Sequence, residues 1–254
     1  KKLKKKGFII ISQDEEAGYI QPSYENFSDQ RHGNGEAFDF IDYFLCWGKR
    51  DHAFLSNKYK NKKCNFVDCG SPRLDLYKKK FKIGRQYLLK NSINKNYILV
   101  SLNFLCFYFR SFSERISLEA DRLGDNYNRY AEEFIKREAE TLYLLEKYIS
   151  LIKFLSQKFP NKTIVVRPHP NFEVDRFKKI TKDFPKNVQI ISNGHLSEAI
   201  KNCELLIQNS CSSAIEAILA NKKVISYCLD NQKYFVSDFV NHFGRKCNSE
   251  AEII

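Results

Sequence analysis

Short apolar runs alternate with helical segments through the second half of the chain, and this alternation limits the fold more than any other feature. Each run is four or five residues long and is bounded by polar residues, which is typical of strands buried on both faces of a parallel sheet. We expect strands at 163–166, 188–191, 204–207 and 223–227, with helices at 175–182, 196–202 and 213–220. The pattern predicts an α/β chain in which helices cover both faces of a parallel sheet.

Two longer segments mark where this sheet begins. Residues 97–102 form an apolar run that follows the polar stretch 90–96, and residues 130–159 carry apolar side chains at the spacing of a helix with one buried face. We therefore predict a domain boundary between residues 96 and 97. The expected domains are 1–96 and 97–254.

The first part of the chain carries a weaker version of the same pattern. We expect strands at 7–12, 43–47 and 65–69, the first of them buried, and helices at 49–57 and 73–80. Methionine is absent even at position 1, and the chain opens almost directly onto the first expected strand. We therefore expect the N-terminal domain to be incomplete.

The composition favours anionic binding partners but does not identify one of them. The 254 residues are 43% hydrophobic and carry a formal net charge of +12, so the chain can bury a core and suits anionic partners. These include nucleotide phosphates, acidic glycans, anionic membrane surfaces and nucleic acid. Because no nucleic-acid-binding motif accompanies the charge, nucleic acid ranks last.

The eight cysteines form no C-x-x-C pair, and no His/Cys cluster has the spacing of zinc ligands. We expect reduced, buried thiols in a cytoplasmic protein and no metal site. Every apolar run is shorter than the roughly 18 residues of a spanning helix. The basic residues 1–6 are expected to be a solvated end, with peripheral contact to an anionic inner membrane as the alternative.

A polar, hydroxyl-rich turn follows the expected strand 204–207. It begins at Gln208 and continues as Asn209-Ser210-Cys211-Ser212-Ser213. Because Ser212 or Ser213 can cap the next helix, we expect backbone N–H groups and hydroxyls to face outward there, as in an anion site. An ordinary helix cap without a ligand is the alternative.

A second polar loop, Arg167-Pro168-His169-Pro170, follows the expected strand 163–166. The prolines stiffen it and disfavour helix around His169. Since ligands of parallel α/β sheets bind at the carboxyl ends of the strands, we expect the loop and the serine turn to form one phosphate site. The alternative is a rigid connector with a hydrogen-bonded histidine.

Two candidate sites lie in the first domain. Asp14, Glu15 and Glu16 follow an apolar run, where one of them could act as a general base or as a nucleophile towards a sugar carbon. A solvated turn is equally compatible with the sequence. The turn at 70–75 leads into a helix with Arg73 near its start, and it suits either ligand contact or an internal charge pair.

Six short motifs containing these residues stand in a fixed order along the chain. They read Asp14-Glu15-Glu16-Ala17-Gly18, Trp47-Gly48, Gly70-Ser71-Pro72-Arg73-Leu74-Asp75-Leu76, Ile98-Leu99-Val100-Ser101-Leu102-Asn103-Phe104, Arg167-Pro168-His169-Pro170 and Asn209-Ser210-Cys211-Ser212-Ser213-Ala214-Ile215-Glu216-Ala217. Together they resemble bacterial surface-carbohydrate biosynthesis proteins, which are related to transferases of Kdo and sialic acid that use CMP-activated sugars. The resemblance covers residues 8–228.

The resemblance implies a GT-B fold, with two Rossmann-like domains facing a cleft. It also implies transfer of a 2-keto sugar acid, Kdo or a nonulosonate, from CMP to a surface polysaccharide or lipopolysaccharide at the inner face of the plasma membrane. No cofactor is implied, because the CMP-sugar is itself the donor substrate, and no metal is needed in principle, because side chains can neutralise the single phosphate of the leaving group. The catalytic carboxylate would come from Asp14, Glu15 or Glu16. The nucleotide would contact Arg167, His169, Pro170, Asn209, Ser210, Ser212, Ser213 and Glu216, and the substrate would contact Pro72, Arg73 and Asn103.

Three alternatives remain open on the sequence. Two keep the fold and change the substrate, namely a polyol-phosphate transferase using CDP-glycerol and a UDP-sugar 2-epimerase. The third is a non-catalytic nucleotide-binding or scaffold protein. The last predicts that the three carboxylates can all be replaced without loss of function.

Overall fold

The chain folds into two compact units, Lys1–Lys82 and Ile83–Ile254. The computed structural model describes residues 1–15, 28, 31–77, 96–103, 114, 117, 120, 127–169, 174–230, 232–233 and 236–254. The boundary predicted between residues 96 and 97 falls after a stretch, 78–95, that lies outside the described residues. That predicted division stays a prediction.

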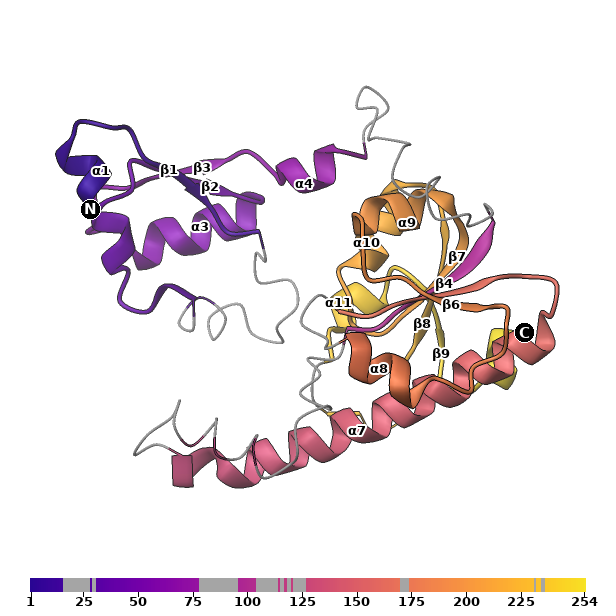
Figure 1. Ribbon diagram of the computed structural model, residues 1–254. Coiled ribbons are helices and arrows are strands. Elements are labelled where there is room, and N and C mark those ends of the chain that lie inside the picture. Colours follow the sequence, from indigo (N-terminus) through magenta and orange to yellow (C-terminus); the bar gives the residue numbers. More distant parts are fainter. Residues whose placement is uncertain are drawn as a thin grey trace. The chain divides into compact units, whose positions relative to one another are not determined.

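The first unit is built on a three-stranded parallel sheet in the order β1-β2-β3 (Figure 1). Its strands are β1 (Ile11–Gln13), β2 (Tyr43–Cys46) and β3 (Asn65–Asp68), and its helices are α1 (Lys2–Lys5), η1 (Glu36–Asp39), α3 (Lys49–Lys58) and α4 (Pro72–Asp75). The strands expected at 43–47 and 65–69 and the helix expected at 49–57 are confirmed. The helix expected at 73–80 is shorter than predicted, because α4 ends at Asp75 and Leu76 and Tyr77 form a turn; residues 78–80 lie outside the described residues.

The core of this unit is aromatic. The ring of Phe38 contacts the rings of Tyr59, at 4.7 Å between centroids, and of Phe44, at 5.3 Å. Gly35 lies against the same cluster with a φ of 74°, and a Cβ there would stand 2.5 Å from a ring carbon of Tyr59. Only glycine allows the backbone to turn this close to the ring.

The prediction of a buried strand at 7–12 is wrong. The strand is only Ile11–Gln13, and Ile9 and Ile11 are 71% and 61% exposed. Among the described residues β1 pairs with β2 alone, so it is an edge strand of the sheet. The basic residues before it form α1, which has no buried residue, and Lys4 forms an ion pair with Asp42.

The second unit contains a six-stranded sheet with the order β6-β5-β4-β7-β8-β9, in which each neighbouring pair is parallel. Its strands are β4 (Tyr97–Ser101), β5 (Ile164–Arg167), β6 (Val188–Ile190), β7 (Cys203–Gln208), β8 (Lys223–Tyr227) and β9 (Arg245–Cys247). The next two strands, β5 and β6, run outward on one side of β4, and the chain then returns to β7 on its other side. The direction of strand order therefore reverses between β4 and β7, which is where α/β sheets bind ligands.

Helices cover both faces of this sheet (Figure 1). They are α7 (Tyr127–Lys158), α8 (Val174–Ile180), α9 (Leu196–Asn202), α10 (Ser213–Leu219) and α11 (Asp238–Asn241), and η3 (Ala251–Ile253) follows β9. In Figure 1 α7 lies on one face, and α9 and α10 lie on the other. The strands and helices expected from the alternation are confirmed, with ends that differ by at most two residues.

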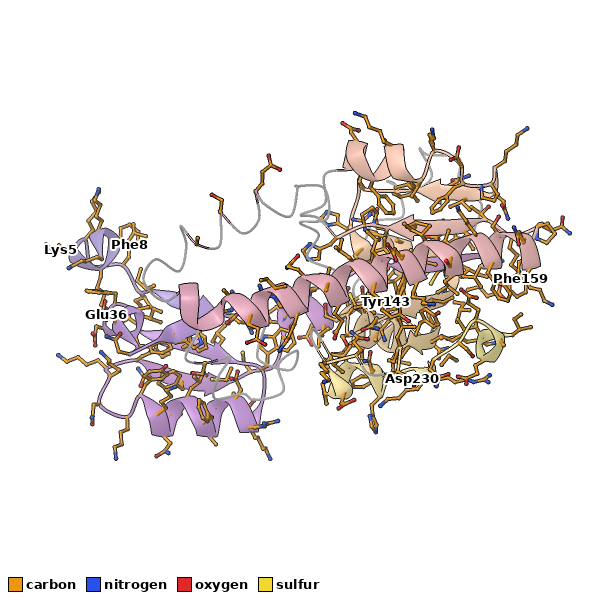
Figure 2. All side chains as sticks on the ribbon, turned by 90° about the horizontal axis from the view of Figure 1, so that it is seen from below. Lys5, Phe8, Glu36, Tyr143, Phe159 and Asp230 are labelled. Atoms are coloured by element: carbon orange, nitrogen blue, oxygen red, sulfur yellow. The ribbon has the colours of Figure 1, made fainter. Side chains whose placement is uncertain are left out.

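The long helix α7 supplies much of the core. Its buried side, which includes Leu144, Tyr148, Leu151 and Leu155, is at most 1% exposed and packs against the sheet. Figure 2 shows this helix along the second unit between the labelled Tyr143 and Phe159. No helix among the described residues is both long enough and apolar enough to cross a membrane.

Candidate functional site

The carboxyl ends of β4, β5 and β7 meet at one edge of the second sheet, because these three strands are adjacent and parallel. The amide of Leu102 donates to the carbonyl of Arg167 at 3.0 Å, which joins the end of β4 to the end of β5. On the other side, Asn103 Nδ2 donates to the Ser210 carbonyl at 2.9 Å. The arginine-histidine loop and the serine turn therefore flank the end of β4, and the prediction that both leave one sheet edge is confirmed.

Ser210 is held by a buried polar cluster. Its backbone has a φ of 50° and its side chain is 1% exposed. Its N–H donates to Asn241 Oδ1 at 2.7 Å. Its Oγ accepts bonds from Ser237 N at 2.9 Å and from Asn241 Nδ2 at 3.0 Å. This hydroxyl therefore points into the protein, and the expectation that it faces outward is wrong.

The side chain of Asn209 is also held by hydrogen bonds within the protein. Its Nδ2 donates to the Tyr227 carbonyl and to Gln232 Oε1, both at 2.8 Å, and Gln232 Nε2 donates back at 3.3 Å. The next amide, of Cys211, donates to Gln208 Oε1 at 2.8 Å. Asn209 and Ser210 thus fix the shape of the turn from within.

The polar groups that remain available are at the start of α10. Ser212 occupies the N-cap position as expected, but its side chain makes no capping bond. Among the described residues, the amides of Ser212 and Ser213 donate no hydrogen bond, and Ser213 Oγ is buried without a partner. Glu216 is 3% exposed one helical turn further on. Two unbonded N–H donors and an unpaired hydroxyl next to the ends of β4 and β7 are suited to an anionic oxygen.

Arg167 has a different role from the one expected for a free cation. Its two terminal nitrogens donate to the carbonyls of Asn193, at 2.8 Å, and Gly194, at 2.5 Å. Burial lowers the pKa of this guanidinium, and the nearby Tyr97 and Glu198 oppose that shift. Arg167 therefore ties the end of β5 to the turn before α9. His169 is half-buried two residues later, and Pro170 lies outside the described residues.

The candidate residues of the first unit gather at the carboxyl edge of its own sheet. Asp14 directly follows β1; its carbonyl accepts a bond from Trp47 Nε1 at 2.7 Å, and its carboxylate lies 3.2 Å from the guanidinium of Arg31. Gln13 Nε2 donates to the Gly70 carbonyl at 2.9 Å, which brings the turn at 70–75 to the same edge. Glu15 is exposed, and Glu16 lies outside the described residues.

The turn at 70–75 is a capped helix start. Ser71 is the N-cap of α4, and its hydroxyl accepts the amide of Leu74 at 3.4 Å. Pro72 is exposed at the first helical position and Arg73 is half-buried at the second. This geometry leaves Pro72 accessible to a substrate, and the contact itself stays a prediction.

Sequence reasoning placed Gln208 in the polar turn but missed the hydrogen bonds that hold the serine turn. Gln208, Gln232, Ser237 and Asn241 supply most of its buried hydrogen bonds. One signal was present, since Ser237 is followed by a short helix whose fourth residue is Asn241, and Ser237 Oγ caps it by accepting the amide of Val240. Among the described residues, no group of three His, Cys, Asp or Glu side chains is placed to hold a metal ion.

No protein-family model matches the sequence, and no curated protein matches it. Among solved structures, the UDP-GlcNAc 2-epimerase of Methanocaldococcus jannaschii in complex with UDP-GlcNAc and UDP is similar, with a TM-score of 0.54 and 16% identity over 99% of this chain and 68% of that one. A second structure of that epimerase gives a TM-score of 0.51 and 18% identity over 98% of this chain and 62% of that one. This chain thus spans about two thirds of the epimerase, and the likeness confirms the expected GT-B-type α/β fold.

Proposed function

We propose that this protein is a nucleotide-sugar-dependent enzyme whose second unit binds the nucleotide phosphate at the carboxyl ends of β4, β5 and β7. In its specific form, it transfers a 2-keto sugar acid, Kdo or a nonulosonate, from CMP to a surface polysaccharide or lipopolysaccharide. The fold supports the general proposal. The choice of CMP and of a keto acid rests on the motif resemblance.

One observation carries the phosphate site. At the point where the strand order reverses, the amides of Ser212 and Ser213 and the buried Ser213 hydroxyl are without hydrogen-bond partners among the described residues. A buried polar group without a partner costs about 1–3 kcal/mol, so a ligand oxygen that accepts these bonds is favoured. The neighbouring bond from Asn103 to the Ser210 carbonyl fixes the turn against the end of β4.

The remaining residues take roles that follow from their positions. His169 is the candidate for direct contact with the phosphate, since Arg167 is bonded to two backbone carbonyls and acts by holding the loop. Departing CMP carries a single phosphate, whose developing charge these donors would stabilise. Asp14, Glu15 or Glu16 would act on the acceptor hydroxyl or on the sugar carbon.

A UDP-sugar 2-epimerase is the second candidate. The observation that favours it is the likeness to an epimerase of that kind over nearly the whole chain. The two candidates share the phosphate site and differ in the base and in the chemistry. Product analysis with a CMP-sugar and with UDP-GlcNAc separates them, because one transfers its sugar to an acceptor and the other converts the sugar in place.

Isothermal titration calorimetry with CMP, CDP, UDP and GDP tests the phosphate site and the base together. We expect CMP to bind, and His169→Ala to weaken CMP binding by about tenfold, as for loss of a hydrogen bond to a charged group. His242→Ala is the matched control, because His242 is exposed directly after α11. Equal CMP affinity in His169→Ala and His242→Ala would exclude His169 from the site, and a preference for UDP would favour the epimerase.

The catalytic carboxylate needs its own test. Replacing Asp14, Glu15 and Glu16 together with alanine should abolish sugar transfer while leaving CMP affinity unchanged. If the triple variant keeps full function, the protein is a nucleotide-binding scaffold.

A further inference from the structure

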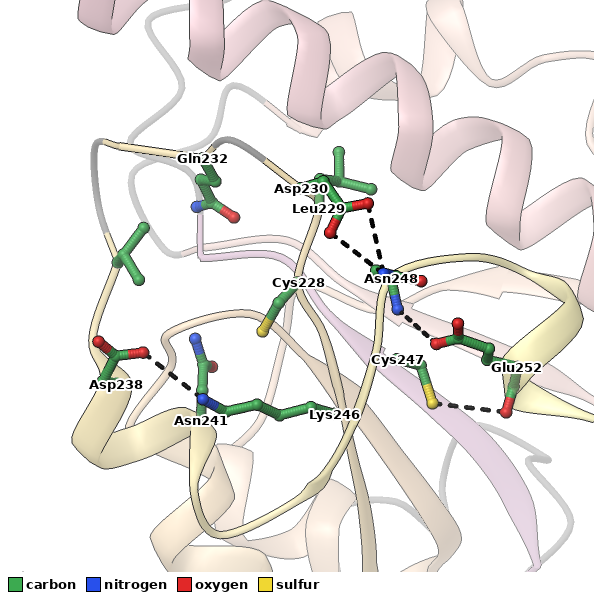
Figure 3. A pocket seen from close by; sticks show the side chains of 11 residues that line it. Cys228, Leu229, Asp230, Gln232, Asp238, Asn241, Lys246, Cys247, Asn248 and Glu252 are labelled. Atoms are coloured by element: carbon green, nitrogen blue, oxygen red, sulfur yellow. Dashed lines mark hydrogen bonds and ion pairs between the residues drawn. The ribbon is translucent and has the colours of Figure 1, made fainter.

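A cavity of about 370 Å³ opens beside the serine turn, at the carboxyl ends of β8 and β9. Its walls are the loop after β8, the helix α11, the residues after β9 and η3 (Figure 3). The volume lies within the range of about 300–1,000 Å³ that is typical of small-molecule sites. The cavity shares the ligand-binding edge of the sheet but lies two strands away from β4.

Hydrogen-bond acceptors dominate one side of this cavity. Asn248 Nδ2 donates to both carboxylate oxygens of Asp230, at 3.1 and 3.3 Å, and the Asn248 amide donates to Glu252 Oε2 at 2.9 Å. Figure 3 shows these three residues together. Neither carboxylate has an ion-pair partner among the described residues. Each carboxylate can accept about four hydrogen bonds, so both retain free acceptor positions.

The charge of the lining excludes an anionic occupant. Three carboxylates, of Asp230, Asp238 and Glu252, face one ammonium group, of Lys246. Lys246 Nζ lies 3.5 Å from Asp238 Oδ1 and is already paired. In a chain with a net charge of +12 this is a locally negative site, which repels phosphate and carboxylate groups and attracts hydrogen-bond donors.

Apolar groups complete the lining. Leu229 and Val236 contribute aliphatic surface, and Figure 3 shows the Cys228 thiol between the two polar sides. Burial raises the pKa of Cys228 to about 11 and also raises that of Cys247, so both thiols stay neutral near pH 7. Carboxylate acceptors combined with neutral, apolar surface suit a ring or chain that carries hydroxyls on one side and C–H groups on the other.

We propose that this cavity binds a neutral, hydroxyl-rich unit, a monosaccharide or a short polyol, whose hydroxyls donate to Asp230 and Glu252. Its wall is continuous with the serine turn, because Gln232 and Asn241 line the cavity and bond to Asn209 and Ser210. The bound unit thus lies next to the proposed phosphate site. The cavity proposal does not depend on the nucleotide assignment.

Saturation-transfer difference NMR on the full chain tests this directly, with methyl α-glucoside and glycerol as neutral probes and N-acetylneuraminate as the anionic probe. We expect signals from the neutral probes only. Asp230→Asn combined with Glu252→Gln should weaken the binding of the neutral probes by about tenfold. Asp183→Asn, which removes an exposed carboxylate outside the cavity lining, should leave them unchanged.

Two further measurements separate the possible failures. Val236→Phe keeps both carboxylates but narrows the cavity, and it should also reduce the signals. Neutral probes that bind the double variant as well as they bind the original protein, or a chain that binds only the anion or no probe, would overturn the proposal. CMP titrations of the double variant should match the original protein within about twofold, and absence of CMP binding would count against the proposed function alone.

Discussion

Replacing Asn241 with alanine is expected to destabilise the second unit more than any change at the exposed surface of α11. Asn241 is 1% exposed and makes two bonds to Ser210, one to its amide at 2.7 Å and one to its hydroxyl at 3.0 Å. Alanine offers neither an acceptor nor a donor. The Ser210 amide would then be buried without a partner, in a turn that requires a positive φ.

The magnitude follows from these contacts. A buried amide left without an acceptor costs about 1–3 kcal/mol, and the second bond contributes about 1 kcal/mol. The weaker contact from Gln208 Nε2, at 3.4 Å, adds little because that nitrogen keeps its bond to Ser226 Oγ at 2.7 Å. The expected loss is therefore about 2–4 kcal/mol, or about 4–16 °C in the melting temperature.

Thermal unfolding followed by far-UV circular dichroism measures this loss, and His242→Ala, at the residue that follows α11, is the control. The control should stay within about 0.5 kcal/mol of the original protein, because His242 is exposed. CMP affinity should also fall in Asn241→Ala, since the serine turn loses its support. A loss below about 1 kcal/mol, or equal losses in both variants, would refute the view that this cluster holds the turn.

Three further outcomes are expected. Gly35→Ala should destabilise the first unit by about 1–3 kcal/mol, because φ is 74° and the new Cβ would meet Tyr59; the urea midpoint reported by the fluorescence of Trp47, the single tryptophan, measures it. Burial lowers the pKa of His32 below 6.5, so the His32 imidazole binds a proton more tightly in the unfolded chain than in the folded one. The urea midpoint of the first unit should therefore stay constant above pH 6.5 and fall as the pH drops below 6.5. His32→Phe should reduce this dependence on pH. Arg167→Ala should cost the second unit about 1–3 kcal/mol in thermal unfolding, with Arg167→Lys only partly restoring it, because lysine lacks the fork that reaches two carbonyls.

The sheet of the second unit could be predicted because apolar runs and helical segments alternate regularly between residues 163 and 227. The edge strand β9 could not, since Arg245-Lys246-Cys247 has no apolar pattern and becomes a strand by pairing with β8. The opposite failure occurred at residues 7–12. An apolar run is read as buried, but the sequence alone does not show which face of the sheet another layer covers.

The candidate site shows the same division between local and long-range information. Its position at the carboxyl ends of β5 and β7 follows from the strand pattern alone. The direction of its side chains does not, because Asn209 bonds to Gln232 and Ser210 bonds to Asn241, more than twenty residues later. Polar residues in a turn therefore indicate a site without showing which of them face the ligand.

Amide hydrogen exchange with and without CMP tests the phosphate site most directly. In the free protein the amides of Ser212 and Ser213 donate to no described residue, so they are expected to exchange rapidly. Saturating CMP should slow exchange at these two positions and at the amides of Arg167 and His169. Protection confined to the first unit or to the loop at 228–233, with residues 212 and 213 unchanged, would contradict a phosphate site at the ends of β4, β5 and β7.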